Sequence, residues 1–150
     1  VATTNLKKFN TGKKVDIRAR KFLKQDGLDY EHGTGHGVGF FSNVHEGPQS
    51  ITKINNVKLE KGMIVSNEPG YYKKGHYGIR IENLVYIKKI NKKLHFENLT
   101  LAPIEKDLTN FKLLNSKEQT YLNNYHKKVY RNLSPRLNLT EKNWLKSFII

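Results

Sequence analysis

Apolar residues recur at helical spacing near the start of the chain and at alternating positions in its middle. Gly27 is a stop signal for a helix over 15–25, one face of which would carry Val15, Ala19, Phe22 and Leu23. The following segment, 28–41, contains four glycines, so we expect strand and loop there. The chain is thus predicted to begin with an amphipathic helix and to continue into an open, glycine-rich segment.

Strands are predicted in the middle of the chain. Residues 63–67 form a short apolar run, which ends at the turn signal Glu-Pro-Gly over 68–70. The segment 77–90 alternates with a period of two and predicts one long strand, with one face carrying Ile79, Ile81, Asn83, Val85 and Ile87. Asn91-Lys92 would then turn the chain into a second strand over 94–101, completing a hairpin.

Helical periodicity returns after Pro103. Ser116 and Gln119 have the spacing of a capping box, and the helix that follows would bury Tyr121, Leu122, Tyr125 and Val129. Thr140 is the predicted cap of a last short helix, which carries Trp144, Leu145 and Phe148. The order of a helix, strands and then helices predicts an α+β fold.

The composition of the chain limits which kinds of binding partner and metal ligand we expect. The formal net charge is +14, but the lysines are spread along the chain instead of forming one stripe, so we expect no nucleic-acid partner. There is no cysteine, so any metal must be held by His, Asp or Glu. No run reaches the length of a membrane span, and we expect no membrane partner. Because the chain begins at Val1 and its only methionine is Met63, we expect it to be a piece of a longer protein.

Candidate ligands for a metal lie in three places along the chain. The glycine-rich stretch contains His32 and His36, and its spacing does not match a G-x-G-x-x-G phosphate loop. Glu68 follows the first predicted strand. Glu82 lies on one face of the long strand with Arg80, where a carboxylate must either pair with the arginine or bind a metal. The remaining histidines outside the motifs are expected on the surface: His76, His95 and His126.

Four blocks of the sequence, in order and at matching spacing, resemble aminopeptidase P of the eukaryotic cytosolic type. This is the Xaa-Pro aminopeptidase branch of the pita-bread metallopeptidases of family M24. The blocks are His32–Gly39, Asn43–Pro48, Glu68–Tyr72 and Gly78–Asn83. The resemblance implies the C-terminal half of a pita-bread fold, an antiparallel curved sheet with flanking helices. Residues 1–104 would belong to the catalytic domain, and 105–150 would form a C-terminal helical extension.

The resemblance also implies a metal-activated hydrolase with a defined set of site residues. His36 and Glu68 would be ligands of one divalent ion, while Glu82 would bridge two ions, with manganese favoured over zinc or cobalt. Glu68 would also shuttle the proton from the attacking water to the leaving nitrogen, and His45 would stabilise the oxyanion. The roles implied for the remaining site residues are substrate binding for His32 and Tyr72, together with His45, and orientation of a ligand carboxylate for Arg80.

Two aspartate ligands that the family requires lie upstream of the first helix and are absent from this sequence. Asp16 and Asp26 have nearly suitable spacing, but one lies at a helix start and the other just before the helix stop, so we reject them as ligands. The chain is therefore expected to be inactive alone and to depend on the remaining N-terminal part of the same protein. The resemblance further implies a homodimer, a cytoplasmic location and peptide substrates with proline in the second position.

A second interpretation is a non-catalytic pita-bread module that binds a peptide or a protein. A binding module has no chemical need to keep all five of the motif histidines and glutamates. Their joint presence favours the enzyme: His32, His36, His45, Glu68 and Glu82.

Overall fold

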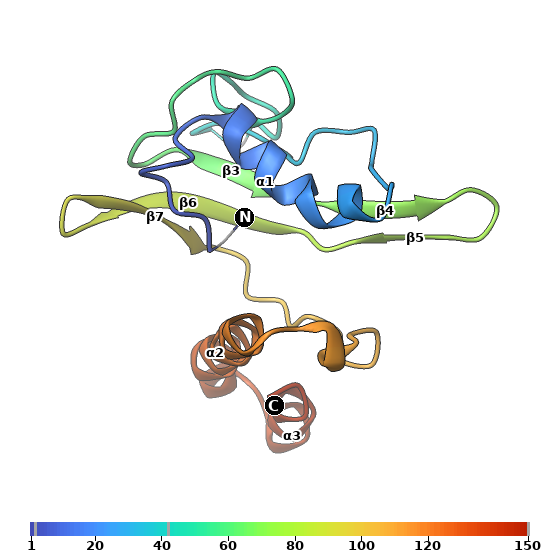
Figure 1. Cartoon of the computed structure of the whole chain (residues 1–150). Helices are drawn as coiled ribbons and strands as arrows, with labels where there is room; N and C mark the ends of the chain where they lie inside the picture. The colour runs from blue at the N-terminus through green and yellow to red at the C-terminus, as the bar shows by residue number, and fades with distance from the viewer. Residues whose placement is uncertain (2, 42, 150) are drawn as a thin grey trace. The chain divides into compact units, whose positions relative to one another are not determined.

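The structure, a computed structural model, describes residues 1, 3–41 and 43–149 and divides into two compact units (Figure 1). The first unit is Val1–Thr100, and the second is Leu101–Ile150. In the first unit the helices and strands are α1 (Gly12–Gln25), β1 (Gly35–His36), β2 (Ser50–Ile51), β3 (Ile64–Asn67), β4 (Gly70–Lys73), β5 (Tyr77–Arg80), β6 (Asn83–Ile90) and β7 (Lys93–Asn98). Helices together with antiparallel sheets confirm the predicted α+β fold.

The face that helix α1 buries overlaps only in part with the one that its apolar pattern predicts. It begins at Gly12, where Thr11 caps it, and Val15 packs into the core of the first unit. Phe22, on the predicted apolar face, is 64% exposed, while Asp16 and Arg20 are almost completely buried. The buried face differs from the apolar pattern at these positions because the two charged side chains find hydrogen-bond partners inside the unit, so their burial is compensated.

Strands β3 to β6 form one long antiparallel hairpin that is interrupted in the middle. Its pairing continues in one register from Ile64↔Tyr86 to Asn67↔Asn83, and again from Gly70↔Arg80 to Lys73↔Tyr77. Between these two ladders, residues 68–69 lie opposite residues 81–82. Proline has no N–H to donate to a ladder, which explains the break at Pro69.

Two predictions about this hairpin are therefore wrong. The segment 68–70 does not reverse the chain, because β4 continues beyond β3 (Figure 1). The predicted strand 77–90 is divided into β5 and β6 at Ile81 and Glu82, and Ile79 and Ile81 are about half exposed. The alternation is correct for the β6 part, where Val85 and Ile87 are fully buried.

The hairpin of β6 and β7 matches its prediction closely. Asn91 and Lys92 both have positive φ, 46° and 63°, as a two-residue turn between antiparallel strands requires. Strand β7 ends at Asn98, three residues before the predicted end. Strand β3 pairs with the other edge of β6, so β6 is the central strand of this sheet.

The short strand β1 lies against β3 through a very close backbone approach. A Cβ atom built on Gly35 would lie 1.9 Å from the Ser66 carbonyl oxygen, so only glycine fits there. The Glu68 N–H donates to the Thr34 carbonyl at 2.8 Å, next to this contact. The glycine-rich stretch thus allows the strand that carries His36 to approach the strand that leads to Glu68.

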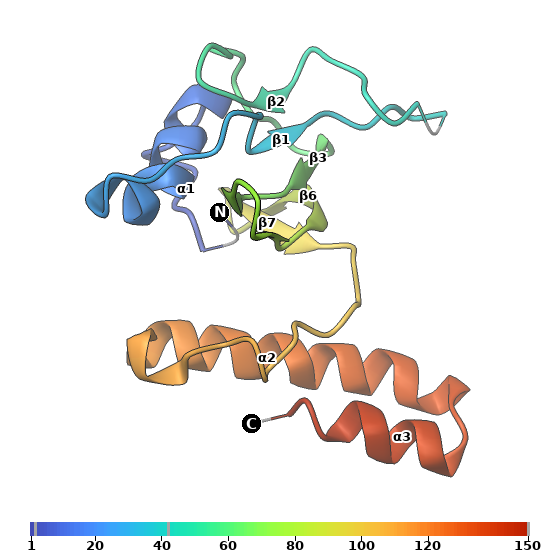
Figure 2. The ribbon, with the colours of Figure 1, turned by 90° about the vertical axis from the view of Figure 1, so that its right-hand side faces the viewer.

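The second unit is a pair of helices packed in opposite directions, shown in Figure 2. Its elements are η1 (Phe111–Leu113), α2 (Ser116–Leu133), η2 (Ser134–Arg136) and α3 (Leu139–Lys146). The predicted apolar stripes are largely correct, and the buried residues of this unit's core are Tyr125, Val129 and Leu145. Trp144, in contrast, is 59% exposed.

Both predicted helix caps are displaced, and one histidine is misplaced. The capping boxes use Asn115 with Glu118 and Asn138 with Glu141, not Ser116 and Thr140, because asparagine side chains also accept first-turn N–H groups. His126, expected on the surface, is only 2% exposed, and its Nε2 accepts the Ile104 N–H at 3.1 Å.

Within the described ranges 1, 3–41 and 43–149, no helix combines the length and the apolar character that crossing a membrane demands. His76 and His95 are exposed, as predicted.

Candidate metal centre

The interruption of the long hairpin places two carboxylates opposite each other. In the register that both ladders share, Glu68 lies across from Glu82. His36 on β1 completes a cluster in which one ligand atom of each residue lies within 4.8 Å of the others. Like charges directly opposite on paired strands repel each other, so this placement favours a cation between them.

The hydrogen bonds of His36 define the ring nitrogen that faces the cluster. Its Nδ1 lies 3.0 Å from the Gly37 carbonyl oxygen, which can only accept, so Nδ1 carries the proton of the neutral ring. The other nitrogen, Nε2, then presents a lone pair 3.5 Å from Oε1 of Glu68. One nitrogen and two carboxylates facing one another are a donor set suited to a divalent ion such as zinc, manganese or cobalt.

Glu68 is held at both of its oxygens. The Ser66 hydroxyl donates to Oε1 at 2.8 Å, and Nη1 of Arg80 donates to Oε2 at 3.1 Å. Ser66 itself accepts the His36 N–H at 2.8 Å, so it ties two members of the cluster together. Arg80 forms its ion pair with Glu68 across the hairpin and not with Glu82, its neighbour on the predicted strand face.

A hydrogen-bond chain extends from Arg80 to His32. Nε of Arg80 donates to the Tyr72 hydroxyl at 2.8 Å, and that hydroxyl lies 2.8 Å from Nε2 of His32. Nδ1 of His32 faces the Gly33 carbonyl oxygen at 2.7 Å, so in the neutral ring Nε2 accepts the proton of Tyr72. The Tyr72 hydroxyl, followed by the nearby Glu68 carboxylate, raises the pKa of the Arg80 guanidinium.

The structure also brings His45 to this place. Its ring centroid lies 4.0 Å from that of His36 in an edge-to-face arrangement. His45 is exposed, whereas Glu68 is 8% exposed. All seven predicted site residues therefore gather in one region of the first unit.

Sequence reasoning missed a buried polar network beside this region. Arg20, only 2% exposed, donates to the carboxylates of Asp16 and Asp29, and the Thr34 hydroxyl donates to Asp16 at 2.6 Å. Burial by itself would raise the pKa of the Asp29 carboxyl, but its hydrogen bonds from Arg20, the Tyr30 N–H and Lys53 hold that pKa well below the usual value. The Asp16–Arg20 spacing of four residues on a helix was the available signal.

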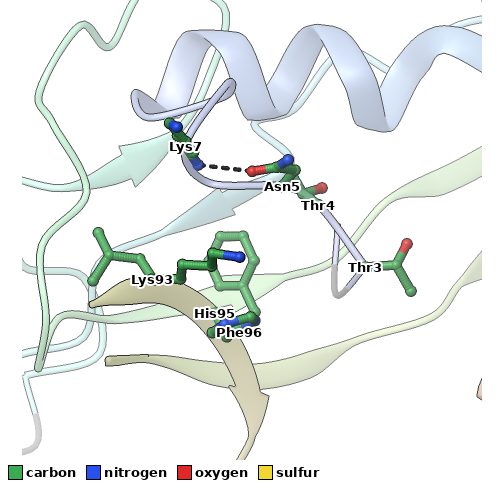
Figure 3. A pocket seen from close by; sticks show the side chains of 8 residues that line it. Thr3, Thr4, Asn5, Lys7, Lys93, His95 and Phe96 are labelled. Carbon is green, nitrogen blue, oxygen red and sulfur yellow. Dashed lines mark hydrogen bonds between the residues drawn. The ribbon is translucent and has the colours of Figure 1, made fainter. Parts of the chain in front are cut away.

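A cavity of about 410 Å³ lies elsewhere, between the first residues of the chain and β7 (Figure 3). The Lys7 N–H donates to the Asn5 side-chain oxygen at its edge. The seven site residues, all of which the structure describes, are not in its lining, which consists of Thr3, Thr4, Asn5, Lys7, Lys93, Leu94, His95 and Phe96. The metal centre is recognised by its donor atoms.

Comparisons with known proteins identify the family. Residues 1–89 match metallopeptidase family M24, and residues 92–148 match the C-terminal region of peptidase M24. The chain is 48% identical over 149 residues to a Coprinopsis cinerea protein named "Probable Xaa-Pro aminopeptidase P", covering 91% of this chain and 24% of that protein. It is 42% identical over 151 residues to "Xaa-Pro aminopeptidase 1" of Dictyostelium discoideum, covering 92% of this chain and 24% of that protein.

A solved structure shows the same architecture. The X-prolyl aminopeptidase of Caenorhabditis elegans, described as a cytosolic enzyme with a di-nuclear active site, is 38% identical to this chain with a TM-score of 0.84. The match covers 93% of this chain and 25% of that enzyme, so the chain spans about a quarter of the length of the relatives that it matches. The arrangement is that of the pita-bread fold, and the chain belongs to metallopeptidase family M24.

Proposed function

We propose that the complete polypeptide containing this chain is a metal-dependent aminopeptidase that hydrolyses the N-terminal Xaa–Pro bond of peptides. The observation that carries this proposal is the pair Glu68 and Glu82, opposed across an interrupted ladder beside the unprotonated nitrogen of His36. The family match and the names of the relatives support a peptidase with this substrate preference.

His36, Glu68 and Glu82 would hold divalent metal, with Glu82 shared between two ions. Bound there, such ions lower the pKa of a coordinated water and polarise the scissile carbonyl. The di-nuclear site of the Caenorhabditis elegans enzyme supports two ions, and we favour manganese over zinc or cobalt. The other ligands would be aspartates supplied by the rest of the polypeptide.

The side chains around the cluster divide the remaining tasks. Glu68 would accept the proton of the attacking water and deliver it to the leaving proline nitrogen, while Ser66 and Arg80 hold its two oxygens in place. The exposed ring of His45 would donate to the oxyanion beside His36. His32 would contact the proline ring, oriented by the Tyr72 hydroxyl at 2.8 Å, and Tyr72 would border the same pocket.

The proposal extends to organisation and location. Residues 1–104 would complete a catalytic domain with the N-terminal part of the polypeptide, and 105–150 would form a helical extension. The enzyme would act as a homodimer in the cytoplasm, with neither nucleic acid nor membrane as a partner. Residues 1–150 alone would lack two metal ligands and would be inactive.

The test is metal content and cleavage of an Xaa-Pro peptide by the complete polypeptide and by its Glu82→Gln variant. We expect about two divalent ions in the unaltered protein, and loss of both metal and cleavage in the variant. Glu97→Gln, which changes a glutamate on β7, is the matched control and should retain both. A complete polypeptide that holds no metal and cleaves nothing would instead favour a non-catalytic pita-bread module that binds peptides or proteins.

A further inference from the structure

The guanidinium of Arg20 is buried in the first unit and connects α1 to the loop that follows it. Nε donates to Asp16 at 2.8 Å on the same helix, and Nη1 donates to Asp29 at 2.6 Å. Nη1 also donates to the Tyr30 carbonyl, and Nη2 donates to the His32 carbonyl, both at 2.6 Å. Its Cζ atom lies 3.9 Å from the Tyr30 ring centroid, so the group is enclosed on its face as well as its edges.

These contacts fix the backbone at His32, a proposed site residue, and immediately before it. The carbonyl groups of residues 30 and 32 both point at one rigid guanidinium, which determines where the His32 ring can lie. That ring is 4.9 Å from the Tyr30 ring and 5.5 Å from the Tyr72 ring, centroid to centroid. A shift of the His32 backbone would therefore break the hydrogen bond between its Nε2 and the Tyr72 hydroxyl.

The metal cluster is linked to Arg20 only indirectly. Thr34 accepts the Glu68 N–H through its carbonyl and donates its hydroxyl to Asp16, and Asp16 in turn accepts from Nε of Arg20, so this path runs through two further residues. His36 is held through Ser66. Loss of the Arg20 fork should thus disturb His32 before it disturbs the cluster.

A lysine in place of Arg20 would keep the positive charge but lose the planar arrangement of N–H donors. A guanidinium offers five N–H groups in a fixed plane, whereas an ammonium is one compact donor point on a flexible stem. The lysine ammonium would still pair with Asp16 or Asp29. It would not reach the carbonyl groups of Tyr30 and His32 at the same time. Buried ion pairs contribute little net stability but can fix one conformation, which is the role that this network suits.

We propose that Arg20 is a positioning residue that sets the substrate-binding orientation of His32 by clamping the Asp29–His32 backbone to α1. The inference rests on the proposed function, because it assigns the effect to the binding of the residue in the second position of the peptide. Arg20 contacts none of the three metal-cluster residues in the hydrogen bonds and ion pairs of the described chain.

The first test is Arg20→Lys in the complete polypeptide, with Arg18→Lys as the matched control from the exposed side of the same helix. For Arg20→Lys we expect kcat/KM for an Xaa-Pro peptide to fall about 10- to 100-fold, as for partners that orient a site residue, with metal content unchanged. Arg18→Lys should leave both unchanged. Loss of metal in Arg20→Lys, or full kcat/KM, would overturn the proposal.

A double-mutant cycle with His32→Ala separates positioning from general support of the fold. If Arg20 acts through His32, adding Arg20→Lys to His32→Ala should cost no more than about a further twofold, because the ring is already gone. If the two substitutions instead lower kcat/KM independently, so that their fold losses multiply, the proposal is contradicted. Should Arg20→Lys not fold, Asp29→Asn, which weakens one arm of the clamp at a partly exposed side chain, takes its place in the cycle with the same expectation and the same contrary result.

Hydrogen exchange of the complete polypeptide gives a measurement independent of activity. In Arg20→Lys, the amides of residues 30–34 should exchange at least about tenfold faster than in Arg18→Lys, because the loop loses its clamp. Equal protection in the two variants would refute the positioning role. If the unaltered polypeptide cleaves no Xaa-Pro peptide, the proposed function fails, and this measurement still decides whether Arg20 fixes the loop.

Discussion

The two units of the chain fill their interiors in different ways. The second unit buries mainly an apolar stripe, formed by Tyr125, Val129 and Leu145. The first unit adds to its apolar core a set of buried charged groups, including Asp16, Arg20 and Glu68. Apolar packing is tolerant of the exact partner, whereas a buried charge needs partners at defined distances. The comparison indicates that the interior of the first unit holds polar side chains at defined distances, whereas that of the second rests mainly on apolar packing.

The largest effect is expected for Glu68→Gln in the complete polypeptide, which tests whether the first unit carries the chemistry. The amide cannot accept the proton of the attacking water, so we expect turnover of an Xaa-Pro peptide to fall about 10²- to 10⁴-fold, the range for loss of a general acid–base group. The thermal midpoint of the metal-free protein should change little, because removing one of two opposed carboxylates relieves their repulsion, while the ion pair with Arg80 is lost. A large loss of stability with turnover retained would show that Glu68 is a structural residue.

The corresponding change in the second unit is Leu145→Ala. Leu145 is 3% exposed, and removing its side chain should lower the free energy of unfolding by about 2–5 kcal/mol, measured by chemical denaturation. The values of kcat and KM at a temperature where the protein stays folded should not change. Leu139→Ala, at a residue 74% exposed on the same helix, is the control and should cost little. A selective change in KM for Leu145→Ala would place the second unit in the site.

His126 is the one buried histidine of the second unit among the described residues, and it gives a test by pH. Burial lowers its pKa below the usual 6.5, so the unfolded chain binds a proton more tightly than the folded one. Stability from this group is therefore complete above about pH 6.5 and declines as the pH falls below that value, by at most about 1.4 kcal/mol for each pH unit. In His126→Gln, the fall in thermal midpoint between pH 7 and 5 should be smaller than in the unaltered protein. An equal fall in both would exclude His126 as the source.

The smallest expected effect concerns the start of α2. Asn115 is the observed cap, so Asn115→Ala should cost about 1 kcal/mol in the free energy of unfolding. Ser116→Ala, at the cap position that the spacing predicts, should cost almost nothing because its hydroxyl is not the capping group. If Ser116→Ala instead cost more stability than Asn115→Ala, Ser116 would be the capping residue and the helix would begin one residue later.

The amino-acid sequence by itself determined the fold class, the hairpin turn at Asn91-Lys92 and the apolar face of α2, because these depend on neighbours in the chain. The motif blocks also indicated the family and the residues of the metal cluster. Periodicity could not predict the break at Ile81 and Glu82, because the break arises opposite Pro69 on the other strand of the hairpin. Nor could it predict that α1 buries Asp16 and Arg20 while Phe22 stays exposed. Those side chains can be buried only because the loop from Asp29 to Thr34 supplies partners, and that arrangement exists only in the tertiary structure.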